Sequence, residues 1–75
     1  MNPIKKMFSE ISDSELKQAI LEIKESDDSG IIEDGVVRKY AKKLSEINNL
    51  NVSNNLDSTQ NKILKEFAYR FVEKL

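Results

Sequence analysis

Apolar residues recur every three or four positions along most of the 75-residue chain, and this spacing is typical of amphipathic helices. No segment alternates between apolar and polar residues as a half-buried strand would. The longest run predicts a helix over about 58–74, for which Asp57 and Gln60 supply a box-like cap. Phe67 and Phe71 lie at the centre of its apolar arc, so we expect both to be core residues. The apolar positions of this helix are Ile63, Leu64, Phe67, Ala68, Phe71, Val72 and Leu75.

Three further helices are predicted from the signals at their ends. Asn2 and Pro3 favour a short helix over about 3–10, with the asparagine as N-cap and the proline in the first turn. Ser12 and Glu15 match a capping box, and the apolar stripe shifts by one residue there, so a separate helix is expected over about 13–25. Asp34 is the expected N-cap of a helix over about 35–47.

The residues between the last two helices read NNLNVSNN, and asparagine-rich segments of this kind favour turns over helix. We therefore predict a connection there. Together the elements predict an all-α fold, with one domain over residues 1–75 built as a small bundle of three main helices plus a short N-terminal helix. A chain of this length is near the size at which a single apolar core only just offsets the loss of chain entropy.

The composition removes most kinds of catalytic site. The chain has no cysteine and no histidine, so it lacks disulfides, thiolate zinc ligands and the commonest general base. Its two glycines do not form a phosphate-binding loop, and no serine lies in a nucleophile-elbow motif. We predict a protein that is not an enzyme, with no catalytic residue and no cofactor. We see neither a signal peptide nor an apolar run of membrane-spanning length, and therefore expect it in the cytoplasm, away from membranes.

The acidic segment ESDDSGIIEDGV, residues 25–36, partly matches the calcium-binding loop of an EF-hand. Asp27, Ser29 and Gly30 occupy its third, fifth and sixth positions. A calcium loop supplies a bidentate glutamate at its twelfth position, but Val36 stands there, and Glu25 is longer than the usual first ligand. We therefore predict a solvated connector between two helices and no metal site.

Charge is distributed unevenly between the two halves of the chain. Residues 1–35 carry four lysines against nine acids, and residues 36–75 carry eight basic side chains against four acids, which gives net charges of −5 and +4. A basic face is expected on the 35–47 helix, opposite its apolar stripe, and consists of Arg38, Lys39, Lys42 and Lys43. Such a face can bind phosphates, so a small DNA-binding regulator is the alternative function. The slightly acidic chain as a whole favours a solvated face instead.

The same region also resembles a helix-turn-helix motif. The run VRKYAKKLSEI would be its first helix, and the segment DSTQNKIL would begin its second. That motif joins its helices by three or four residues. About nine residues separate the predicted helices here, and Ser45 stands where a glycine is common. The predicted spacing therefore disfavours a helix-turn-helix.

Two side chains outside the predicted stripes are candidates for binding a partner. Leu21 points away from the stripe of the 13–25 helix, where it would cover the short N-terminal helix, stay exposed or contact a partner, and the first option is slightly favoured. Tyr69 lies just past the edge of the last helix's apolar arc. A tiny helical protein without catalytic groups acts through its surface.

The leading prediction is therefore a non-catalytic protein-binding module. Its partner would be a larger protein of unknown identity, with a homodimer as a further option. The abundance of lysine, isoleucine and asparagine fits an AT-rich genome. This usage favours a small regulatory, inhibitory or immunity-type accessory protein of a low-GC bacterium or its phage.

Overall fold

Four helices make up the computed structural model, which describes residues 2–72 and 74. They are α1 (Pro3–Ser9), α2 (Asp13–Ser29), α3 (Val36–Asn48) and α4 (Val52–Val72), and the described residues contain no strand. The predicted all-α bundle of three main helices plus a short N-terminal helix is confirmed. Residue 73 and Leu75, which the predictions placed in the last helix or its apolar run, lie outside the described residues.

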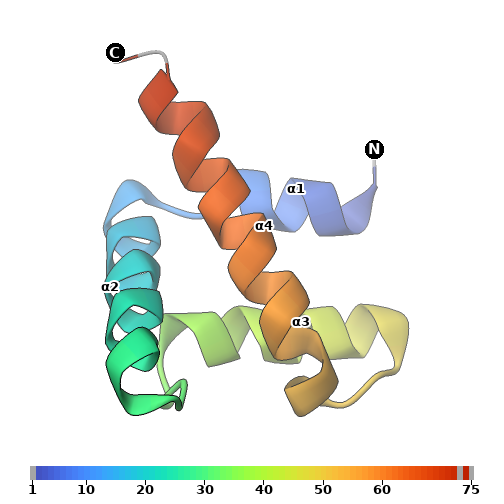
Figure 1. Cartoon of the computed structure of the whole chain (residues 1–75). Coiled ribbons are helices and arrows are strands. Elements are labelled where there is room, and N and C mark those ends of the chain that lie inside the picture. Colours follow the sequence, from blue (N-terminus) through green and yellow to red (C-terminus); the bar gives the residue numbers. More distant parts are fainter. Residues whose placement is uncertain (1, 73, 75) are drawn as a thin grey trace.

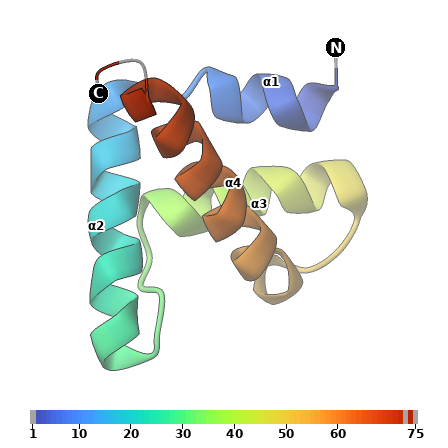
Figure 2. The same ribbon diagram turned by 45° about the horizontal axis from the view of Figure 1, so that its top comes forward.

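The helices form two unequal layers. α1, α2 and α3 make an open frame, and α4 runs across this frame and contacts all three (Figure 1, Figure 2). The molecule is flat as a result, with extents of 36, 36 and 16 Å. The core lies where α4 crosses the frame, and its buried cluster consists of Phe8, Ile11, Leu16, Ala19, Ile32, Val37, Tyr40 and Ile63. On its outer side, α4 carries no further layer within the described residues.

The first two helices begin where the local capping signals predict. Asn2 Oδ1 accepts a hydrogen bond from the Ile4 N–H at 2.8 Å, and Ser12 Oγ accepts one from the Glu15 N–H at 3.2 Å. These side chains satisfy amide groups that the first turn of a helix leaves unpaired. The predicted capping box is only half formed, because the Glu15 carboxylate reaches toward α3 and not back to Ser12.

α2 continues past its predicted end near residue 25 and stops at Ser29. Asp27 and Asp28 therefore lie in its last turns. The helix ends at Gly30, whose φ of 77° is the left-handed conformation that glycine adopts without steric cost. The first five residues of ESDDSGIIEDGV are thus helical, and the segment does not form one continuous loop of the EF-hand kind.

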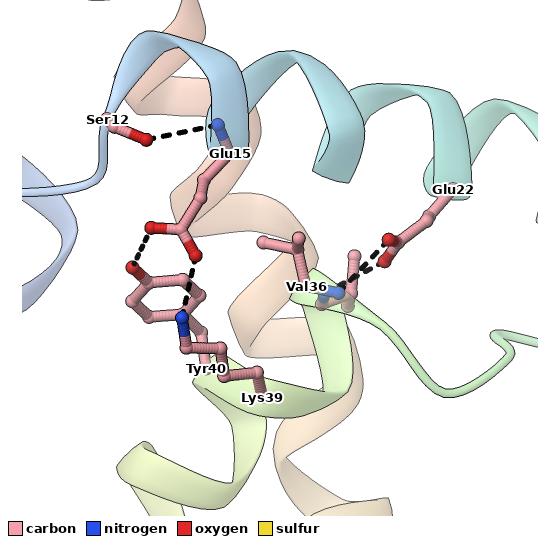
Figure 3. Close-up of polar contacts among 7 residues, drawn as sticks. Ser12, Glu15, Glu22, Val36, Lys39 and Tyr40 are labelled. Carbon is pink, nitrogen blue, oxygen red and sulfur yellow. Dashed lines mark hydrogen bonds and ion pairs between the residues drawn. The ribbon is translucent and has the colours of Figure 1, made fainter.

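The start of α3 is capped from another helix, and the prediction that Asp34 is its N-cap is wrong. Gly35 holds the N-cap position and offers no side-chain hydrogen bond. The Glu22 carboxylate of α2 instead accepts hydrogen bonds from the N–H groups of Val36 at 3.0 Å and Val37 at 2.9 Å (Figure 3). A β-carbon at position 35 would collide with this carboxylate, whose carbon would lie 2.8 Å away. Glycine therefore leaves room for a cap that the helix dipole also favours.

α4 begins at Val52 and not near residue 58, so most of the predicted NNLNVSNN connection is helical. The predicted cap at Asp57 is wrong, because Asp57 lies inside the helix. The actual capping contact comes earlier, where Asn51 Oδ1 accepts a hydrogen bond from the Asn54 N–H at 2.8 Å. An asparagine that competes with helix in its interior supports helix when it stands just before the first turn.

Asn55 anchors this early start of α4 from inside the protein. Its side chain is 2% exposed and donates hydrogen bonds to Ser45 Oγ at 3.0 Å, to Asn48 Oδ1 at 3.2 Å and to the Asn51 carbonyl at 3.2 Å. It also accepts one from Asn48 Nδ2 at 2.7 Å. The connection between α3 and α4 is consequently only residues 49–51, with Asn49 in the left-handed conformation at a φ of 62°. The spacing that disfavoured a helix-turn-helix was therefore wrong.

The core position of α4 also differs from the prediction. Ile63 is fully buried, Phe67 is half-buried, and Phe71 is 46% exposed. The last turns of α4 extend past the frame of α1 and α2, as Figure 1 shows. Phe71 lines an open groove beside α2 and stays nearly half exposed, so the expectation that it is a core residue is wrong.

Candidate protein-binding surface

An apolar groove opens between α2 and α4. It encloses about 430 Å³, and its apolar lining consists of Leu16, Ile20, Leu21, Phe67 and Phe71. The rings of Phe67 and Phe71 stack with their centroids 4.3 Å apart, so the two side chains form one aromatic wall. Leu21 on the opposite wall is 44% exposed. The groove is in the size range of sites that bind apolar groups from a ligand or partner.

Arg70 fixes the position of α4 beside this groove. Its guanidinium bonds Asp13 Oδ1 at 2.9 Å, Glu66 Oε1 at 3.0 Å and the Ser9 carbonyl at 3.3 Å. The contact with Glu66 is an i,i+4 ion pair within α4. The other two contacts join α4 to the end of α1 and the start of α2. The groove walls are therefore held in place without a partner.

The outer side of α4 continues the apolar surface of the groove. Leu64 is 44% exposed, Val72 is 64% exposed, and Ala68 between them is also exposed. These residues stand four apart, so they line up along one side of the helix. We call Leu64, Ala68 and Val72 the outer strip. It adjoins Phe71. The second half of α4 therefore has more apolar surface than its contacts with the other helices bury.

The two predicted partner-binding residues, Leu21 of α2 and Tyr69 of α4, line two different grooves. Leu21 lines the α2/α4 groove, in which no α1 residue takes part, so the slightly favoured expectation that it covers the N-terminal helix is wrong. Tyr69 is 73% exposed and lines a second groove, between α1 and α4, together with Ile4 and Phe8. Leu21 and Tyr69 therefore do not form one patch.

One of the predicted phosphate-binding lysines is committed to a contact inside the protein. Lys39 Nζ lies 2.7 Å from Glu15 Oε2, and the Tyr40 hydroxyl donates to Glu15 Oε1 at 3.1 Å (Figure 3). The hydrogen bond from Lys39 lowers the pKa of the Glu15 carboxyl, and the same bond raises the pKa of the Lys39 ammonium. Burial, with the hydrogen bond to Glu15, raises the pKa of the Tyr40 hydroxyl. These three side chains join α2 to α3.

The other three basic side chains of α3 do not converge on one point. Arg38 Nε donates to the Ile32 carbonyl at 2.6 Å, which ties this arginine to the connection before α3. Lys43 Nζ lies 4.8 Å from the centre of the Tyr40 ring, within the range of a cation–π contact. Lys42 is exposed. The predicted basic face exists on one helix, but Arg38 and Lys39 already have partners.

Residues 2–72 and 74 contain no group of three or more acidic side chains arranged to hold a metal ion. Over the same residues, none of the helices combines the length and the apolarity needed to cross a bilayer. Comparisons with models of protein families, with curated proteins and with solved structures found no match.

The apolar pattern did not separate groove residues from core residues. Ile20, Phe67 and Phe71 have the helical spacing of buried positions, yet they line an open groove. The signal that could have revealed this is the width of the apolar arc on the last helix. That arc covers about half of the helix, which is more than contact with a single flat layer buries.

Proposed function

We propose that the protein is a non-catalytic module that binds a larger protein by docking an apolar-faced helix of that protein in the α2/α4 groove. The observation that carries this proposal is the stacked pair Phe67 and Phe71 facing the half-exposed Leu21. Grooves lined in this way accept the apolar face of an amphipathic helix, with anchors at positions i, i+3 or i+4, and i+7.

The magnitude of the available apolar burial supports docking. Full burial of a Leu or Phe side chain contributes about 1.5–3 kcal/mol, so covering the exposed half of each would contribute roughly 1 kcal/mol. Leu21, Phe71 and the outer strip together offer several such contributions. Because Arg70 already holds α4 in place, little of this energy is lost in ordering the groove.

We further infer a cytoplasmic accessory role of regulatory, inhibitory or immunity type, in a low-GC bacterium or its phage. The support is compositional: a short chain, rich in lysine, isoleucine and asparagine, without histidine or cysteine. These properties fit a protein that acts by occupying another protein's surface and not by chemistry of its own.

The test combines capture and titration. The protein is immobilised, partners are captured from a lysate of its native host, and any captured protein is purified and titrated against variants. Leu21→Asp and Phe71→Asp place a charge in the groove and should each weaken binding by about tenfold or more. Ile31→Asp is the matched control, because Ile31 is 63% exposed on the connection after α2. A purified partner bound equally well by all three variants would contradict the proposal.

DNA binding through α3 and α4 is the second candidate function, because three residues join these helices and Asn49 adopts the left-handed conformation there. A helix-turn-helix places the first turns of its second helix against base edges. In α4 those turns, residues 52–61, carry Asp57 and no lysine or arginine. Protein binding is therefore the better supported function.

A gel-shift titration with random-sequence duplex DNA at two salt concentrations separates the two candidates. A DNA-binding function requires affinity that falls steeply as salt rises, because binding releases counterions from the phosphates. It also requires that Lys42→Ala with Lys43→Ala abolish the shift while helical circular dichroism is unchanged. Protein binding as the primary function predicts weak or no shift at physiological salt.

A further inference from the structure

The second groove, between α1 and α4, differs in character from the α2/α4 groove. It encloses about 540 Å³ and has Ile4 and Phe8 at its base, with Tyr69 on the α4 side. Phe8 is almost fully buried and Ile4 is half-buried, whereas Tyr69 is 73% exposed. The groove thus has an apolar floor that belongs to the core and an aromatic side chain that stands free in solvent.

Lysines line this groove from both helices. Lys5 comes from α1, and Lys62 and Lys65 come from α4. The one acid in its lining, Glu66, is paired with Arg70 at 3.0 Å. Within residues 2–72 and 74, no carboxylate lies within ion-pair distance of Lys5, Lys62 or Lys65. The charge over the apolar floor is therefore positive and uncompensated.

We propose that the α1/α4 groove is a second docking surface, whose occupant is an acidic amphipathic helix of a partner protein. Its apolar face would cover Ile4, Phe8 and Tyr69, and its carboxylates would pair with the lysines on both walls. Lining residues on α4 run from Lys62 to Tyr69, a rise of about 10 Å, which matches about two turns of a docked helix. This proposal concerns a different surface from the α2/α4 groove and is tested separately from it.

Other occupants fit the groove less well. Single-stranded nucleic acid is bound by successive aromatic platforms along a basic groove, and this groove offers one exposed aromatic ring. A second copy of the chain would have to supply an acidic helix. The exposed side of α2 carries Lys17 and Lys24 beside Leu21, so it is not uniformly acidic. Charge complementarity therefore favours an acidic helix from another protein.

The test uses two synthetic amphipathic helices that share one leucine face and differ in their flanking residues, glutamate in one and lysine in the other. Labelled peptides are titrated with the full-length protein by fluorescence anisotropy, and amide chemical shifts locate the bound peptide. The glutamate peptide should bind at least about tenfold more tightly than the lysine peptide, and the difference should shrink at high salt. Tyr69→Ala should weaken binding of the glutamate peptide.

Charge reversal supplies the decisive control. Lys62→Glu with Lys65→Glu should reverse the preference, so that the lysine peptide becomes the tighter ligand. Lys42→Glu with Lys43→Glu makes the same charge change on α3 and should leave the preference unchanged. Circular dichroism checks that both double variants keep the parent helicity. This is expected because Lys42, Lys43 and Lys65 are exposed, and the half-buried Lys62 makes no ion pair within the described residues.

Several results would overturn the inference. These are equal affinity for the two peptides, no saturable binding of the glutamate peptide, or a preference that the Lys62 and Lys65 reversal leaves intact. Tighter binding of oligo(dT) than of the glutamate peptide would assign the groove to single-stranded nucleic acid. Self-association that the reversal abolishes in sedimentation would assign it to a second copy. Peptide binding lost in Leu21→Asp but kept after the reversal would reject this groove while supporting the α2/α4 proposal.

Discussion

Replacing Asn55 with alanine should destabilise the fold by about 2–3 kcal/mol. The side chain makes four hydrogen bonds to Ser45, Asn48 and Asn51 while it is 2% exposed. Each bond contributes on the order of 1 kcal/mol net. Asn48 and Asn51 are exposed, so water can form part of the hydrogen bonds that they lose with Asn55. The higher helix propensity of alanine offsets about 0.5 kcal/mol of the destabilisation.

The consequence is large for a domain of this size. The entropy of unfolding for 75 residues is about 0.16 kcal/mol/K near the midpoint, so the variant's Tm should fall by roughly 12–19 °C. Helical circular dichroism measures the Tm, and urea titration gives the free energy of unfolding.

The control is the neighbouring residue. Asn54→Ala removes an exposed side chain that makes no hydrogen bond within the described residues, so stability should be unchanged or rise by a few tenths of a kcal/mol. Equal melting of the Asn55 and Asn54 variants would refute the conclusion that the buried amide holds the start of α4 against α3.

Glu22→Ala and Gly35→Ala should each lower the free energy of unfolding by about 1–2 kcal/mol, and the double variant by no more than the larger single effect, because both changes remove the same cap. Additive losses in urea titrations would contradict this. Ile63→Ala should lower the free energy of unfolding by about 2–5 kcal/mol, whereas Phe71→Ala should lower it by less than about 1 kcal/mol, since Phe71 is half-exposed. Equal losses of stability would show that Phe71 is a core residue. A hydrogen-bonded lysine lowers the pKa of Glu15, so the stability that this ion pair contributes is present above the ordinary carboxyl pKa and is lost as pH falls through the lowered value. The unfolding free energy of the parent should therefore fall more steeply below about pH 4 than that of Glu15→Gln, and parallel pH profiles would rule this out.

Helix ends were predictable where both partners of a cap lie close in sequence. The Asn2 and Ser12 caps each act on an amide two or three residues ahead, so the local pattern contains the whole interaction. Glu22 caps amides 14 and 15 residues away, and only the folding of α2 against α3 brings them together. The sequence pattern therefore named Asp34, the nearest suitable side chain, in place of Glu22.

The start of α4 was missed for a related reason. Asparagine favours turns because its short amide bonds the nearby backbone when no better partner is present. At position 55 the amide meets Ser45 and Asn48 of α3 inside the protein, and this tertiary contact outweighs the local preference. Because the start of α4 was placed too late, the connection between α3 and α4 was predicted to be about nine residues long and not three. The short connection is the feature that makes a helix-turn-helix, and hence DNA binding, worth testing.

Burial and hydrophobicity run in opposite directions along α4. Asn55 and Thr59, in its first half, are 2% and 0% exposed, whereas Phe71 and Val72, near its end, are 46% and 64% exposed. A core can be assigned from apolar spacing only where another layer packs against the apolar face. The end of α4 extends past the frame of α1 and α2, so the described residues provide no such layer there (Figure 1). Apolar area left in water adds little to the stability of the monomer, but it would stabilise a complex that covers it. The second half of α4, with a groove on either side, is therefore the surface to change first, ahead of the basic residues of α3.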